Sequence, residues 1–151
     1  MHLIRVVTHI AAPAERCFDL ARDIDAHLVS TTETGERVVA GRTSGLMEFG
    51  DTVTFEARHL GVRQRLTSRI TAFDRPRYFR DRMVRDAFQS FEHDHFFETL
   101  PDGRTRMTDV LRFRVPFGVL GWPAGRWIVG PYLGQFLVRR AGVLKTLAER
   151  K

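Results

Sequence analysis

Apolar and charged side chains alternate with a period of two through the middle of the chain, and this pattern restricts the fold more than any other feature. It runs through residues 51–60, 62–73, 77–85, 90–100 and 104–115. In residues 77–85, for example, Phe79 and Met83 alternate with Arg80 and Arg82. Side chains at alternate positions of a strand point to opposite faces. The pattern therefore predicts an antiparallel sheet with one apolar face and one solvated face.

The flanking segments supply the remaining elements. The sequence predicts a strand at residues 3–10, short helices at 14–22 and 24–29, a strand at 37–40, and a long amphipathic helix within 118–151. Pro13 suits the first turn of the first helix, and Gly130-Pro131 is expected to start or kink the last one. An apolar sheet face needs a cover, which only the long helix can supply. The expected fold is α+β, a curved sheet around a C-terminal helix, with residues 1–151 as one domain.

The composition is that of a globular protein and excludes several other classes. Hydrophobic residues make up 43% of the chain and charged residues 28%, and no apolar run reaches the length of a membrane span. Cys17 is the single cysteine, which excludes an internal disulfide framework and predicts a cytoplasmic protein. The formal net charge of +6 leaves nucleic acid and acidic lipid open as partners.

The positive charge comes almost entirely from arginine, and one group of arginines lies on the predicted solvated face of the sheet. These are Arg63, Arg65, Arg69, Arg80 and Arg82. Glutamates on the same face balance them, and no aromatic residue interleaves them as a single-strand nucleic-acid binder requires. The pattern therefore favours a solvated face and argues against nucleic acid as a partner.

The stretch FEHDHFFE at residues 91–98 places two histidines inside a run of phenylalanines. Leu100 to Arg104 predicts a hairpin turn, with Gly103 in the left-handed conformation. Counting back from this turn aligns the two flanking strands. The predicted inward pairs are Phe97 with Met107, His95 with Asp109, His93 with Leu111 and Phe91 with Phe113. The predicted outward pairs are Glu98 with Arg106 and Glu92 with Arg112, and Phe96 is the one large apolar residue left outside.

This register points His93, His95 and Asp109 towards the long helix. The preceding turn, near Asp86-Ala87, is less defined, but any register that keeps Phe79 inward brings Asp81 close to one of the histidines. Burying four ionisable groups costs several kcal/mol unless they pair with one another or meet water. The space between sheet and helix is therefore not expected to be a dry, fully packed core.

Several motifs resemble those of the START-like, helix-grip (SRPBCC) superfamily, in particular its polyketide cyclase/dehydrase-like or cell-division-inhibitor-like bacterial branch. They are APAERCFDL after the first strand, GDTVTF, FRDRM, FEHDHFFE, and TD at Thr108-Asp109 through VPFG at residues 115–118. The branch often has glycine near the turn where this chain has Asp86-Ala87. The resemblance implies a cavity between sheet and helix that holds a hydrophobic small molecule, lipid-like or polyketide-like.

The residues expected to contact such a ligand come from the inward faces of the sheet and the helix. They are Phe55, Phe79, Asp81, Met83, Phe91, His93, His95, Asp109, Phe113, Tyr132 and Phe136. For any single phenylalanine, ordinary core packing is the simpler interpretation. The protein is expected to be a monomer or a homodimer.

Whether the chain is an enzyme stays open. As the alternative to a binding module, a cyclase or dehydratase would use His95 with Asp109, and His93 with Asp81, for acid–base chemistry. A metal held by His93, His95 and Asp109 is a weaker alternative, and we predict neither a metal nor another cofactor.

The apolar segment from Pro116 to Pro123 has several interpretations. It suits a mobile lid, transient membrane contact, or a partner contact of a regulatory protein. The simplest interpretation is a packed connection into the last helix.

Overall fold

A computed structural model describes residues 1–85 and 88–150. Its strands are β1 (His2–Ile10), β2 (Arg37–Gly41), β3 (Thr52–His59), β4 (Val62–Asp74), β5 (Tyr78–Arg85), β6 (Ser90–Thr99) and β7 (Thr105–Arg114). Its helices are α1 (Ala14–Ala21), α2 (Ile24–Ser30), a 3-10 turn η1 (Thr32–Thr34), α3 (Gly118–Ala124), a π-helical turn η2 (Gly125–Val129) and α4 (Gly130–Glu149). The predicted turn at Asp86-Ala87 lies outside the described residues.

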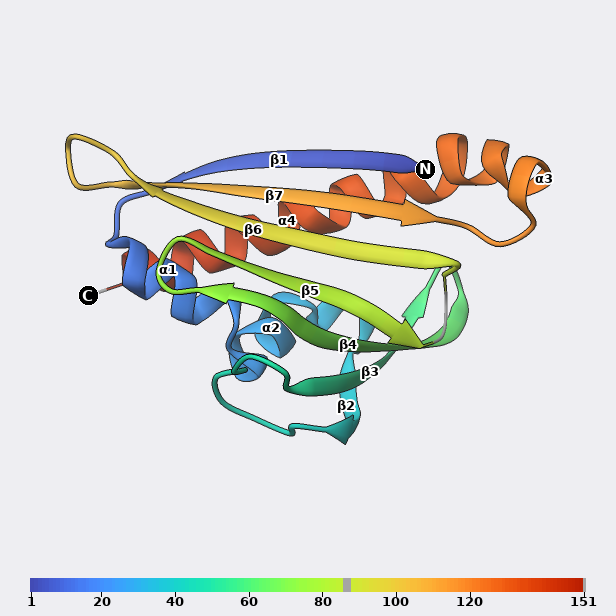
Figure 1. Cartoon of the computed structure of the whole chain (residues 1–151), viewed down its shortest axis with the longest axis horizontal. Coiled ribbons are helices and arrows are strands. Elements are labelled where there is room, and N and C mark those ends of the chain that lie inside the picture. Colours follow the sequence, from blue (N-terminus) through green and yellow to red (C-terminus); the bar gives the residue numbers. More distant parts are fainter. Residues whose placement is uncertain (86–87, 151) are drawn as a thin grey trace.

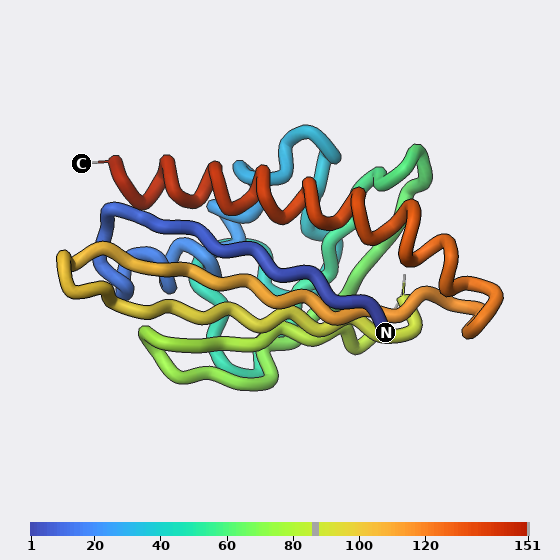
Figure 2. Tube along the Cα trace, turned by 90° about the horizontal axis from the view of Figure 1, so that it is seen from above, coloured from blue at the N-terminus to red at the C-terminus, as the bar shows by residue number. Residues whose placement is uncertain are grey.

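The strands form one sheet in the order β1-β7-β6-β5-β4-β3-β2, and every neighbouring pair is antiparallel. Helix α4 runs along the sheet, and α1 and α2 lie on the same side of the sheet (Figures 1 and 2). The predicted α+β architecture, a curved sheet around a long C-terminal helix, is confirmed. No helix in the described part of the chain is long and apolar enough to cross a membrane.

Local sequence explains where the helices begin. The carboxylate of Asp23 accepts hydrogen bonds from the backbone N–H groups of Asp25 and Ala26 and so caps α2. Pro131 lies in the first turn of α4 and has no N–H to donate to the carbonyl four residues earlier. The π-helical turn η2 ends at Val129, directly before α4, and joins α3 to α4 without interrupting the helical path.

The hairpin between β6 and β7 has the predicted register. Gly103 is left-handed, with a φ of 86°, and the N–H of Leu100 donates to the carbonyl of Arg104 at 2.8 Å. All six predicted cross-strand pairs are present, and Phe96 is 43% exposed on the outer face. The period of two and the turn together therefore set the direction of every side chain on these strands.

One predicted outer ion pair has different partners. Glu98 and Arg106 are joined at 3.0 Å as expected. Glu92, however, pairs with Arg80 at 3.4 Å, while Arg112 reaches the carboxylate of Asp94 at 2.7 Å. Arginine is long enough to contact a diagonal neighbour on the same face, so correct strand register did not decide its partner.

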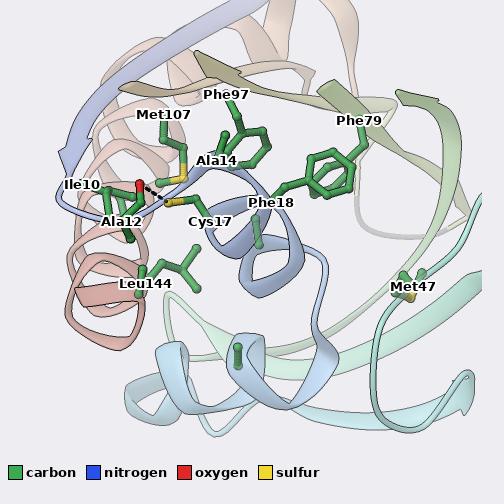
Figure 3. Packing of buried hydrophobic residues seen from close by; sticks show 14 of the residues in the cluster. Ile10, Ala12, Ala14, Cys17, Phe18, Met47, Phe79, Phe97, Met107 and Leu144 are labelled. Carbon is green, nitrogen blue, oxygen red and sulfur yellow. Dashed lines mark hydrogen bonds between the residues drawn. The ribbon is translucent and has the colours of Figure 1, made fainter. Parts of the chain in front are cut away.

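The apolar core consists of two clusters. At the end that holds α1, the Phe18 ring is fully buried and packs edge-on against Phe73, Phe79 and Phe97, as Figure 3 shows for the last two. A second, smaller cluster lies under the first half of α4. Its buried members are Leu111, Phe113, Leu133 and Leu137.

Candidate functional site

A cavity of about 420 Å³ lies between the inner face of the sheet and the helices. Most of its wall is apolar, with contributions from every strand between β3 and β7 and from α4. Apolar lining residues include Val53, Phe55, Ile70, Phe79, Phe91, Leu133, Phe136 and Leu137. This volume falls within the range of small-molecule sites.

The predicted site residues divide into two groups. Those that line the cavity are Phe55, Phe79, Asp81, Phe91, His93, His95, Tyr132 and Phe136. Met83, Asp109 and Phe113, which were also predicted to contact ligand, are not among the lining residues. Phe113 is fully buried and packs against the ring of Phe88, and Asp109 contacts the two histidines of the lining. Inward direction on a strand is therefore not sufficient for contact with the cavity.

His93 and His95 form two hydrogen-bonded pairs with aspartates on the neighbouring strands. His93 Nε2 lies 3.0 Å from Asp109 Oδ1, and His95 Nε2 lies 2.7 Å from Asp81 Oδ2. The partners are the reverse of the predicted ones, because each ring bonds to its diagonal neighbour: Asp109 lies opposite His95 and Asp81 opposite His93. Side chains in strands lean along the strand, which brings diagonal partners into reach.

The two imidazole rings also contact each other. Their centroids are 3.7 Å apart at a tilt of 31°, and the His95 ring stacks on that of Phe79 at 4.1 Å. His95 is 1% exposed and His93 is 6% exposed. The three rings thus form a buried group, in which both histidines have little freedom to change orientation.

The surroundings give the two histidines opposite shifts. Burial lowers the pKa of His93 below its ordinary value, and the adjacent His95 lowers it further, despite the carboxylate contacts. For His95, burial opposes the charge, but its contacts with Asp109 and Asp81 prevail and raise its pKa. The pKa of each carboxyl is lowered, since contacts with the histidines outweigh burial. The cluster therefore favours two carboxylates, one imidazolium at His95 and a neutral imidazole at His93.

Each histidine keeps one ring nitrogen without a hydrogen-bond partner among the described residues. His93 uses Nε2 for Asp109, and its Nδ1 is 4.0 Å from the nearest Asp81 oxygen. With Nε2 protonated, Nδ1 of the neutral ring carries a lone pair. His95 Nδ1 lies 3.1 Å from Asp109 but lacks hydrogen-bond geometry there. The cluster thus offers one nitrogen with a free lone pair at His93 and, at His95, the ring that is protonated more readily.

Asp81, His93 and His95 each have a possible ligand atom within 4.8 Å of the others. The metal site considered from the sequence used the same two histidines but had Asp109, not Asp81, as its carboxylate. Because Asp81 and His95 are already paired with each other, the arrangement is explained without an ion. The absence of a metal stays a prediction.

Sequence reasoning missed a second polar group in the cavity wall. Arg140 of α4 is 5% exposed and lines the cavity. It donates from one terminal nitrogen to the Ala21 carbonyl at 3.0 Å and from Nε to His27 Nδ1 at 3.4 Å. No carboxylate of the described residues forms an ion pair with it. The apolar stripe of α4 could have identified Arg140 as an inward-facing residue, because Arg140 falls between Leu137 and Leu144 on the buried side of the helix.

Two further polar pairs lie along the cavity. His27 Nε2 contacts Glu36 Oε1 at 3.0 Å, and His59 Nδ1 contacts the Tyr132 hydroxyl at 2.7 Å. The sequence predicted Tyr132 as a ligand contact but gave no reason to select His27, Glu36 or His59. His59 and Tyr132 are 73 positions apart in the chain, and His27 and Glu36 belong to different segments, so only the folded arrangement brings each pair together.

The raised pKa of His95 predicts a particular pH dependence of stability. A group with a raised folded-state pKa stabilises the protein fully below its unfolded pKa of about 6.5, and this stabilisation disappears as pH rises through the folded value. Replacing His95 with glutamine is therefore expected to lower the free energy of unfolding more at pH about 6 than at pH about 9. Denaturant titrations of both proteins at the two pH values measure this. An equal loss at both would contradict the assignment of charge to His95.

Comparisons with known proteins agree with this architecture. The chain resembles in fold the protein TTHA0849 of Thermus thermophilus, with a TM-score of 0.76, 21% identity, and coverage of 96% of this chain and 95% of that one. It also resembles the Zhui aromatase/cyclase of Streptomyces sp. R1128, with a TM-score of 0.75, 17% identity, and coverage of 99% and 94%.

A START superfamily protein of Mycobacterium smegmatis is similar as well. Its TM-score is 0.71 at 14% identity, and the match covers 99% of this chain and 98% of that one. At such identities these likenesses show the shared helix-grip fold and nothing more specific. No curated protein sequence matches this chain.

A family model decides the classification. The model described as "Polyketide cyclase / dehydrase and lipid transport" matches residues 1–149, which include all strands and helices of the described fold. The chain belongs to the polyketide cyclase/dehydrase and lipid transport family.

Proposed function

We propose that the protein binds a hydrophobic small molecule, lipid-like or polyketide-like, in the cavity between the sheet and α4. The observation that carries this proposal is the cavity itself, about 420 Å³ of space with mostly apolar walls in the middle of the fold. A chain selected only for stability would fill such a space, because cavities in a core are destabilising. The family description, which includes lipid transport, supports the same proposal.

The polar groups in the wall indicate how such a molecule is oriented. Arg140 is a buried cation that donates hydrogen bonds to the Ala21 carbonyl and to His27 Nδ1 and forms no ion pair with a carboxylate of the described residues, and a buried charge without a close counter-charge is costly. A carboxylate or another strong acceptor on the ligand would compensate it. We therefore expect the ligand to place its polar end at Arg140 and its apolar part against Phe55, Phe91 and Phe136.

Arg140→Met is expected to weaken binding of a fluorescent fatty acid such as cis-parinaric acid by about tenfold or more, since a charge-assisted hydrogen bond is lost. The corresponding fatty alcohol should bind the wild type less tightly and be nearly insensitive to the substitution. Arg139→Met is the matched control, because the neighbouring Arg139 is exposed and pairs with Glu33 on the surface. Fluorescence titration measures all these affinities.

Two results would contradict these proposals in different ways. If neither probe binds, and native mass spectrometry of protein purified from its own host shows no retained small molecule, the binding function is wrong. If both probes bind equally and Arg140→Met changes neither affinity, the cavity binds ligand but the orientation through Arg140 is wrong.

Acid–base catalysis is the second candidate, because His93 keeps a free ring nitrogen in the cavity wall. The neutral His93, oriented by Asp109, would accept a proton, and the charged His95, held by Asp81, would donate one. Turnover of a retained ligand that is lost in His93→Gln, with fatty-acid binding intact, would support a cyclase or dehydratase. Unchanged turnover would remove His93 from the chemistry.

A further inference from the structure

We propose that the segment of residues 116–129, which contains α3 and η2, is a docking surface for an anionic lipid membrane. It would bring this part of the cavity wall against the membrane. The exposure and charge of this segment support such docking, whichever ligand the cavity holds.

The segment buries its smallest residues and exposes its largest apolar ones. Gly121 and Gly125 are buried, and a β-carbon would collide with the Pro116 carbonyl at Gly121 and with the His2 ring at Gly125. By contrast, Val119 is 89% exposed and Leu120 is 88% exposed. A helix in contact with water has the opposite arrangement. This inversion indicates that an apolar phase contacts the outer side of the segment.

Aromatic residues extend the same surface. Phe117 is 83% exposed, Trp127 is 68% exposed and Trp122 is 48% exposed. The guanidinium of Arg126 lies over the Trp127 ring, 4.7 Å from its centroid. Tryptophan and arginine side chains of this kind suit the boundary between lipid headgroups and acyl chains, where a ring enters and a charge remains outside.

The segment also forms part of the cavity wall. Pro116, Phe117 and Val129 line the cavity, together with Leu60 from the turn between β3 and β4. Leu60 is 52% exposed. Both views place α3 and the β3–β4 turn at the same end of the molecule (Figures 1 and 2). A membrane that contacts the exposed side chains of this end would therefore lie next to the cavity.

The charge of the residues near this segment favours an anionic membrane as the partner. No aspartate or glutamate occurs between Asp109 and Glu149. Of the basic residues in that interval, Arg140 is buried and Arg112, Arg139 and Lys145 pair with carboxylates, which leaves Arg114 and Arg126. Arg114 and Arg126 are exposed on either side of α3, and anionic lipids attract basic residues near a membrane surface. A second copy docked through the same patch would bring the exposed arginines of both copies together, so a membrane is favoured over self-association.

The chain has only two tryptophans, and both lie in this segment. Intrinsic fluorescence therefore reports directly on it. Vesicles of equal parts phosphatidylcholine and phosphatidylglycerol are expected to shift the emission to shorter wavelength and to sediment with the protein. Pure phosphatidylcholine vesicles are expected to bind more weakly, and the binding to anionic vesicles should fall with added salt.

Leu120→Asp is expected to weaken vesicle binding by about tenfold or more, because it places a charge where an apolar side chain would insert. Arg126→Gln should weaken binding to the anionic vesicles by about fivefold and leave binding to pure phosphatidylcholine nearly unchanged. Val29→Asp is the matched control, since Val29 is 53% exposed on α2, outside the segment. Thermal melts confirm that each variant is folded.

Three results would overturn the proposal. The first is that neither vesicle binds, and the second is that Leu120→Asp binds as tightly as the wild type. The third is a fluorescence shift that grows with protein concentration without vesicles, which would assign the surface to a second copy of the chain. None of these outcomes depends on the fatty-acid titration, so this proposal and the proposed function can fail separately.

Discussion

Asp109→Asn is expected to lower the free energy of unfolding at neutral pH by about 3–5 kcal/mol, among the largest single effects in this protein. The side chain keeps its shape but loses the charge that lies 3.0 Å from His93 Nε2 and 3.1 Å from His95 Nδ1. Asp109 is 1% exposed, so water cannot replace the lost interaction. The imidazolium of His95 would then be balanced by Asp81 alone.

Equilibrium unfolding in urea measures this loss. The pKa of Asp109 is lowered in the folded state, so its stabilisation is present above the unfolded value of about 3.9 and is lost as pH falls towards the folded value. The difference between wild type and variant should therefore narrow in acid. Asp74→Asn, at an exposed carboxylate paired with Arg77, is the control and should cost at most about 1 kcal/mol. If both variants lost a comparable amount of unfolding free energy, the buried contacts of Asp109 with the two histidines would not be more stabilising than a surface ion pair.

Phe18→Ala is expected to destabilise the protein by about 3–5 kcal/mol, because it removes a fully buried ring from the centre of the larger core cluster. The ring centroid of Phe18 lies 5.2 Å from that of Phe79 and 5.4 Å from that of Phe97. Figure 3 shows Phe18 at the meeting point of α1 with the sheet. The cavity left behind would be lined by side chains that cannot easily close it.

The same substitution should also disturb the candidate site, since Phe79 is the ring on which His95 stacks. Thermal and denaturant unfolding measure the stability change, and histidine resonances in NMR spectra report on His95. Phe49→Ala serves as the control, because Phe49 is 67% exposed and its loss should cost at most about 0.5 kcal/mol. A loss for Phe18→Ala as small as that of the control would mean that the core closes around the missing ring.

The fold and the inward direction of the histidines were predictable from the sequence. A period of two and a glycine turn are local properties of the backbone, and together they determine register and face. They placed His95 opposite Asp109 and left Phe96 outside, both of which the structure confirms. The covering helix followed from its own spacing and from the need to bury an apolar sheet face.

Contacts between side chains from distant segments were not predictable in this way. The sequence alone determined the order of elements, the register at the Gly103 turn and the inward direction of His93, His95 and Asp109. Only the tertiary structure decided that His95 bonds to Asp81, that Arg140 lies in the cavity without a carboxylate partner among the described residues, and that Leu120 is exposed. The physical reason is that periodicity encodes the direction of a side chain, whereas its partners depend on how the sheet curves and how closely the helices approach it.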